Sequence, residues 1–146
     1  MAQRSVVLKG KAQWAKVFED NRDMKGFEGA YEENDGAYTI DVILDKEEFD
    51  KLKATGSIKK GVLTEDGIKV NFVRKHRIGG REYGPPRVKD ADGNKWDKGL
   101  IGNGSEVEVG LVVYDTKYKG RAGTRLEAIR VVEHVPVEGG AADLPF

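Results

Sequence analysis

Apolar and polar residues alternate most regularly in the second half of the chain, where they predict a long β-hairpin over residues 98–133. Apolar side chains occupy every second position from 107 to 113, which is the spacing of a strand with one buried face. A second run rich in Leu, Ile and Val follows at 124–135. The segment 114–125 carries four basic residues, two tyrosines and two glycines. The predicted hairpin therefore has a basic tip with aromatic rings.

Shorter patterns in the first half predict a strand followed by one short helix. Residues 37–44 alternate, with apolar side chains at the even positions, and form a strand. Asp45 is followed three residues later by Glu48, which matches a helix capping box. Gly56 lies just past the expected end of this helix of about three turns.

The N-terminal segment and the middle of the chain add further strands. Residues 3–18 have the period of a strand on which Trp14, Lys16 and Phe18 share one side. That side is either a stacking platform or a core face with a lysine whose amine reaches water. Residues 57–77 predict a hairpin around a Glu-Asp-Gly turn.

Glycine, proline and a change of phase mark the irregular parts. Residues 19–36 are polar and rich in glycine, and 74–87 form a basic loop interrupted by Gly-Gly and Pro-Pro. Residues 88–96 predict another hairpin around Asp-Gly-Asn, where a turn explains the residues better than a calcium loop does. The apolar phase of the last strand changes between Leu126 and Ile129, which indicates a bulge.

These elements predict an all-β fold with one short helix. About six or seven short strands without βα alternation favour a five-stranded Greek-key barrel, and a sandwich is the alternative. A length of 146 residues indicates one domain, which we place at 1–135. Residues 136–146 lack periodicity and are expected to form a flexible C-terminal tail.

Charge is segregated along a chain whose net charge is zero. Residues 19–50 hold twelve acids and three bases, whereas 74–87 hold five bases and one acid, and 117–130 hold five bases and one acid. Such blocks can build one positive face on a neutral protein, and ordinary solvated surface is the alternative.

Composition limits the environment and the chemistry. No apolar run is long enough to span a bilayer, and the N-terminus has no apolar signal core. Because cysteine is absent, we expect no disulfides and no zinc site, and a reducing cytoplasm is the default compartment.

Catalysis is poorly supported by the residues present. There is no cysteine, His76 and His134 are far apart in the sequence, and no Gly-x-Ser-x-Gly motif occurs. We therefore predict no catalytic residues, no metal and no cofactor. A metal-dependent nuclease that uses Asp41 and Asp45 is kept as an alternative.

Cations placed beside aromatic rings favour a ligand that is anionic and has flat faces, as single-stranded DNA does. Stacking of a base on a ring contributes about 1–3 kcal/mol, and cations add a salt-dependent term. No helix has the length and basic face of a major-groove reader. A core position is the alternative for each ring. The predicted DNA-binding residues are Trp14, Lys16, Arg74, Arg77, Arg81, Tyr83, Arg87, Trp96, Tyr114, Tyr118, Lys119, Arg121 and Arg125.

Two stretches resemble the single-stranded-DNA-binding proteins of short-tailed phages. They are LIGNGSEVEVGLVVY at 100–114, followed by RLEAIRVVE, and GFEGAYEENDGAYTIDVIL at 26–44. The resemblance implies an OB-fold that coats single-stranded DNA, without catalysis, during phage replication, recombination and repair. It implies DNA contact for Tyr114. Asp35 stands where the family has a basic residue, so that contact is not carried over, and the family's long acidic tail is missing here.

The C-terminal tip, Asp143-Leu144-Pro145-Phe146, is similar to the tip of bacterial single-strand binding proteins. The similarity implies docking onto replication proteins such as a polymerase, a helicase or primase, or a nuclease. A terminal Phe fills an apolar pocket while carboxylates meet Arg or Lys. We expect a viral protein in the host cytoplasm, compatible with a homodimer. A structural or assembly protein of the virion is the other alternative.

Overall fold

Strands make up most of the computed structural model, which describes residues 3–118 and 120–136. Three short 3-10 turns, Glu19–Asn21, Phe27–Gly29 and Glu32–Asn34, lie in the predicted polar loop. The prediction of an all-β fold with one short helix is confirmed. The strands are β1 (Gln3–Lys16), β2 (Ala37–Leu44), β3 (Val62–Thr64), β4 (Gly67–Lys75), β5 (Arg77–Ile78), β6 (Arg81–Glu82), β7 (Arg87–Asp90), β8 (Glu106–Asp115) and β9 (Ala122–Glu133), and the helix is α1 (Lys46–Ala54).

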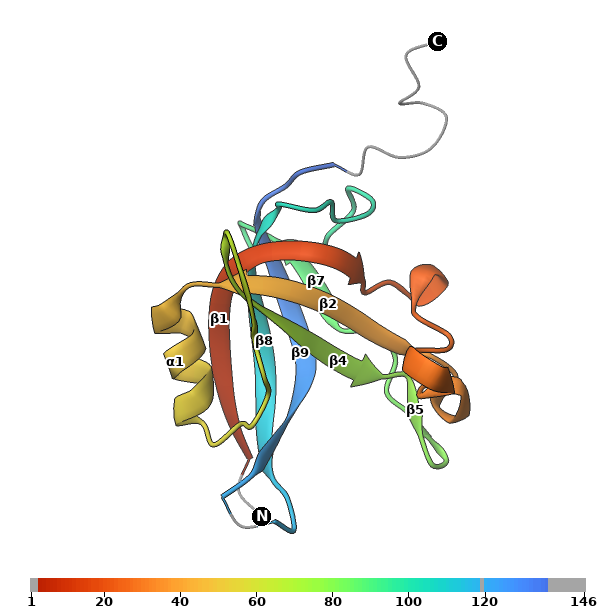
Figure 1. The fold of residues 1–146 in the computed structure, drawn as a ribbon. Helices are drawn as coiled ribbons and strands as arrows, with labels where there is room; N and C mark the ends of the chain where they lie inside the picture. Colours follow the sequence, from red (N-terminus) through yellow and green to blue (C-terminus); the bar gives the residue numbers. More distant parts are fainter. Residues whose placement is uncertain (1–2, 119, 137–146) are drawn as a thin grey trace.

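Seven of these strands form one curved sheet in the order β3-β4-β2-β1-β8-β9-β7 (Figure 1). Strand β1 pairs with β8 through residues 3–11 and with β2 through 11–16, so it connects the two halves of the sheet. Strand β4 approaches β9, where Arg74 Nη1 donates to the carbonyl oxygen of Leu126 at 3.3 Å. The sheet thus curls into a barrel and is not divided into a sandwich. The hairpin β5–β6 stands apart from it.

The long hairpin is confirmed as β8 paired with β9 in antiparallel register. The alternating apolar residues of β8, from Val107 to Val113, are buried in the core. Opposite Gly110, the register shifts between Leu126 and Ala128, which leaves Glu127 without a partner in the ladder. This is the bulge that the change of apolar phase predicted.

Helix α1 begins as its sequence predicts but uses only half of the capping box. Asp45 Oδ1 accepts a hydrogen bond from the backbone N–H of Glu48 at 2.9 Å. The carboxylate of Glu48 instead accepts from the backbone N–H of Lys9 at 2.8 Å, and so ties the helix to β1. Gly56 follows the helix with a φ of +95°, a conformation that favours glycine. Leu52 is fully buried beneath the helix.

The end of β1 differs from the simple alternation that its sequence suggests. The register with β2 shifts between Gln13 and Lys16, and Trp14 has a φ of +51°, rare for a residue with a side chain. Trp14 is 66% exposed and Lys16 is exposed, but Phe18 packs partly against the core. Trp14 and Lys16 are thus both exposed, whereas Phe18 turns toward the core, so the expectation that the three share one side is wrong for Phe18.

No helix in the described ranges could span a membrane.

Two of the predicted turns are present. The hairpin β3–β4 pairs around residues 64–67. In the second turn, Asp90 Oδ1 accepts from the backbone N–H groups of Asn94 and Asp92, each at 2.9 Å. These bonds lower the pKa of Asp90. They use the carboxylate to fold the turn, in agreement with the prediction.

Candidate nucleic-acid interface

Tyr83 is the centre of a cluster of guanidinium groups. The Cζ atoms of Arg81, Arg125 and Arg74 lie 4.8, 5.4 and 5.8 Å from the centroid of its ring. The three arginines come from β6, β9 and β4, so distant parts of the sequence meet at this half-buried ring. Attraction between a cation and the ring face holds such an arrangement together. Rings and cations are what a single strand requires of its binding surface.

Arg74 clamps the basic loop onto the barrel. The structure begins this loop at residue 76 and not at the predicted 74, because Arg74 and Lys75 end β4, so the basic loop is residues 76–87 from here on. Its Nε donates to the carbonyl oxygen of Gly84 and its Nη2 to that of Tyr83, both at 2.9 Å. Its Nη1 donates to Glu127 Oε2 at 2.9 Å. The side chain is only 11% exposed. The geometry therefore makes Arg74 a residue that positions the loop, whereas the sequence predicted it among the DNA-binding cations.

Glu127 holds two of the arginines that surround Tyr83. Its Oε1 accepts from Nε and Nη2 of Arg125 at 2.9 and 2.8 Å, while Oε2 pairs with Arg74. Because Glu127 is the extra residue of the β-bulge, its side chain does not follow the inward–outward alternation of β9. The sequence analysis missed Glu127 as a positioning residue, although the change of phase around it was visible.

Tyr114 lies on the same outer face of the hairpin as Arg125. Tyr114 pairs with Gly123, and Val112 pairs with Arg125, one step along the same face. A Cβ atom at position 123 would lie 2.5 Å from the Tyr114 ring, so the glycine makes room for that ring. Tyr114 and Arg125 therefore share this face, and the ring of Tyr83 lies against the Arg125 guanidinium.

The hairpin tip adds further cations and a third ring. Tyr118 is exposed, with Lys117 Nζ 5.3 Å from its ring centroid. Arg121 and Tyr118 line a hollow of about 380 Å³ that also includes Arg4 from β1. Lys119, another predicted DNA-binding residue, lies outside the described residues.

A buried hydrogen-bond chain fixes the root of the basic loop. The Tyr38 hydroxyl and His76 Nδ1 are 2.7 Å apart, and His76 Nε2 lies 3.2 Å from Glu82 Oε1. Burial raises the pKa of Tyr38. Because an ionised carboxylate can only accept, Nε2–H donates to Glu82, and in the neutral imidazole Nδ1 then accepts from the Tyr38 hydroxyl. Glu82 also pairs with Arg77 at 3.1 Å. The charge of Arg77 is therefore partly neutralised. The guanidinium of Arg81 instead lies against the ring of Tyr83.

The remaining predicted residues lie toward the other end of the barrel. The backbone N–H of Trp14 donates to Asn103 Oδ1 at 2.8 Å, just before β8 begins, whereas Tyr114 lies near the end of β8. A strand of this length spans about 30 Å. In Figure 1 the β8–β9 tip is at the bottom and the segment before β8 is at the top. The structure therefore separates Trp14 and Lys16 from Tyr114.

Trp96 has little free surface and Arg87 has much. Trp96 is 8% exposed, its Nε1–H donates to the carbonyl oxygen of Gly99 at 2.7 Å, and its ring meets that of His134 edge to face. Trp96 is thus mainly a core residue. Arg87 is exposed at the start of β7, where β7 runs parallel to β9.

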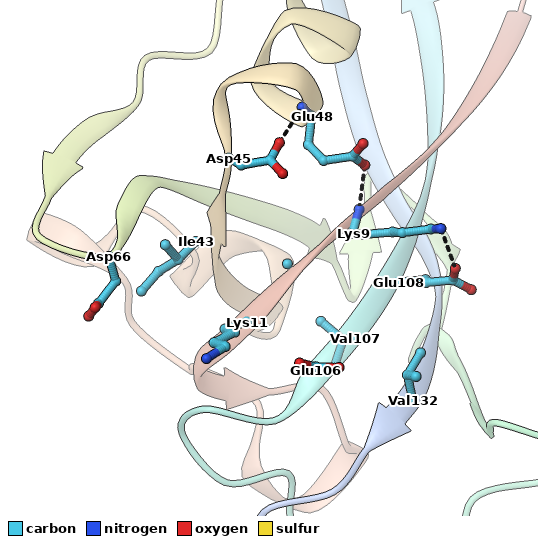
Figure 2. A pocket seen from close by; sticks show the side chains of 11 residues that line it. Lys9, Lys11, Ile43, Asp45, Glu48, Asp66, Glu106, Val107, Glu108 and Val132 are labelled. Carbon is cyan, nitrogen blue, oxygen red and sulfur yellow. Dashed lines mark hydrogen bonds and ion pairs between the residues drawn. The ribbon is translucent and has the colours of Figure 1, made fainter.

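A hollow of about 500 Å³ at the bend of β1 is unsuited to a polyanion because carboxylates line it (Figure 2). Asp45 caps α1, Glu48 binds Lys9, and Glu108 pairs with Lys9 at 3.9 Å. The lining residues with charged side chains are Lys9, Lys11, Asp45, Glu48, Asp66, Glu106 and Glu108.

The geometry also disfavours the nuclease alternative. Asp41 Oδ1 accepts from Asn71 Nδ2 at 2.8 Å, and Asp45 is occupied as the helix cap. Four residues of extended chain separate the two carboxylates by about 13 Å, too far to share one ion. Over residues 3–118 and 120–136, no three His, Cys, Asp or Glu side chains are grouped to hold a metal.

Comparison with known proteins identifies the fold. No family model and no curated protein sequence matches the chain. Among solved structures, gp2.5, a single-stranded DNA binding protein encoded by bacteriophage T7, superposes with a TM-score of 0.61 at 18% identity, over 97% of this chain and 93% of that one. The single-stranded DNA-binding protein from bacteriophage Enc34 superposes with a TM-score of 0.56 at 11% identity, over 95% of this chain and 85% of that one. The structure of the Enc34 protein in complex with single-stranded DNA superposes with a TM-score of 0.59 at 11% identity, over 94% of this chain and 89% of that one. The chain therefore has the OB-fold-like barrel found in these phage proteins.

Proposed function

We propose that the protein binds and protects single-stranded DNA, without catalysis, during phage DNA replication, recombination and repair in the host cytoplasm. The observation that carries the proposal is that Tyr114 shares an outer face of an OB-like barrel with Arg125, whose guanidinium lies against the ring of Tyr83. The sequence resemblance and the structural neighbours support the same function.

The proposed path of the DNA follows the basic loop and the hairpin. It runs from the tip at Arg121, past Tyr114 and Arg125, to Tyr83 and the exposed guanidinium of Arg81. Bases stack on the rings, while Arg121 and Arg81 neutralise phosphates in a salt-dependent manner. Because backbone-directed cations and rings do not read base edges, we expect little sequence preference.

Titration of oligo(dT) at several salt concentrations tests the proposal. We expect tight binding at low salt, and Arg121→Ala to flatten the plot of log affinity against log salt by about 0.7, the value for one phosphate of a single strand. Arg77→Ala should flatten it less, because Glu82 already partly neutralises Arg77. Lys46→Ala, which removes an exposed cation from α1, is the control and should change nothing. Absence of binding would reject the function and favour the virion protein.

We also propose that the tail recruits replication proteins, although residues 137–146 lie outside the described residues. Deletion of 144–146 is expected to leave or raise the DNA affinity and to abolish pull-down of a polymerase, helicase, primase or nuclease. Asp143→Asn is a milder variant, with an expected partial loss of capture. Loss of DNA affinity on deletion would contradict this role.

The protein is also compatible with a homodimer, and sedimentation velocity of the full chain distinguishes that state from a monomer.

A further inference from the structure

A second, largely apolar hollow lies beyond the basic loop. Its volume is about 350 Å³. Val17 and Trp96, both buried, form part of its lining, and Phe18, Pro85 and Pro86 line it with flat or compact rings. Phe18 follows the end of β1 and the prolines come from the segment before β7, so the tertiary fold alone creates this slot. Apolar surface of this shape suits a flat ring, which stacks on aromatic side chains independently of its identity.

Three cations surround the slot. Arg87, Lys89 and Lys95 all line it and are exposed, and Glu19 is the one acidic residue in the lining, so cations outnumber anions there. Within the described part of the chain, none of them forms an ion pair with a carboxylate. Their charge is therefore available to phosphates, unlike that of Arg74 and Arg125, which Glu127 holds.

The slot lies close to Tyr83 along the chain. Arg74 binds the carbonyl oxygens of Tyr83 and Gly84, and Pro85 follows immediately. Three residues of chain, from Tyr83 to Pro86, reach at most about 10 Å. A strand that lies on Tyr83 thus needs to advance by only a short distance to place its next bases at the slot.

We propose that this slot receives one unpaired base of the bound strand while Arg87, Lys89 and Lys95 hold the neighbouring phosphates. The inference rests on the proposed function and adds a subsite to it. It gives Phe18, Pro85 and Pro86 a direct role in binding, which the sequence analysis assigned to none of them. It also gives Arg87 its place on the DNA path.

Trp96 in the lining provides a reporter for the base. In a Trp14→Phe variant of the full chain, Trp96 is the remaining tryptophan. Binding of oligo(dT) is expected to quench its fluorescence. A fully abasic oligonucleotide of equal length has the same phosphates and no bases, and at low salt it should bind more weakly without this quenching.

Phe18→Ala tests the slot against a matched control. Stacking predicts a loss of oligo(dT) affinity of about tenfold or more for Phe18→Ala, with the affinity for the abasic oligonucleotide unchanged. Phe27→Ala removes the same kind of side chain from the polar loop that follows Phe18, where Phe27 is 84% exposed, and should change neither affinity. Equal quenching by both oligonucleotides, or an equal loss of both affinities, overturns the slot but leaves DNA binding intact. Failure of the unaltered protein to bind oligo(dT) overturns both.

Discussion

Replacing Arg74 with methionine is expected to lower the free energy of unfolding by about 3 kcal/mol, because it removes one side of a largely buried ion pair. The guanidinium lies at the seam between β4 and β9 and donates to three carbonyl oxygens as well as to Glu127. Methionine fills similar space but leaves these acceptors without a donor. Urea unfolding followed by far-UV circular dichroism measures the loss.

Arg77→Met is the matched control for this prediction. It removes the same charge three residues away, where the side chain is exposed and its pair with Glu82 faces solvent, so the expected loss is below about 1 kcal/mol. DNA binding separates the two roles that Arg74 could have. A phosphate contact would make Arg74→Met flatten the salt dependence while stability stays unchanged. If Arg74 instead clamps the loop, Arg74→Met should lower the stability and weaken DNA binding while the slope of log affinity against log salt stays unchanged.

Local periodicity explains why much of the fold was predictable from the sequence. Alternation over 107–113 fixes which side of β8 is buried, and the side chain of Asp45 caps the helix that directly follows it. Even the bulge at Glu127 left a trace in the apolar phase of β9. Each of these features depends on neighbours within a few residues, so a single sequence contains the information.

The composition of the site could be predicted only in part, because pairing between distant residues decides which charges are free. Arg74 and Arg87 belong to the same basic run, yet Arg74 is bound by Glu127, 53 positions away, whereas Arg87 is exposed. The ring of Trp96 is likewise buried against His134. Neither contact leaves a periodic signal. The sequence thus showed where cations and rings gather, but not which of them stabilise the barrel and which are free to bind a ligand.

Tyr83→Ala is expected to weaken oligo(dT) binding by about tenfold to a hundredfold, the range for loss of one stacked base. Tyr83→Phe keeps the ring and its contacts with the arginines and should retain most of the affinity. Because a ring carries no charge, the salt dependence should change little. Binding titrations of both variants at two salt concentrations measure the effect.

Combining Tyr83→Ala with Tyr114→Ala tests whether the two rings lie on one DNA path. If each stacks a different base of the same strand, their free-energy losses add, and the double variant should lose the product of the two single factors. If Tyr83→Ala weakens binding neither alone nor in combination with Tyr114→Ala, the strand leaves the hairpin without crossing the basic loop. The proposed path to the slot would then fail as well, because it passes over the ring of Tyr83.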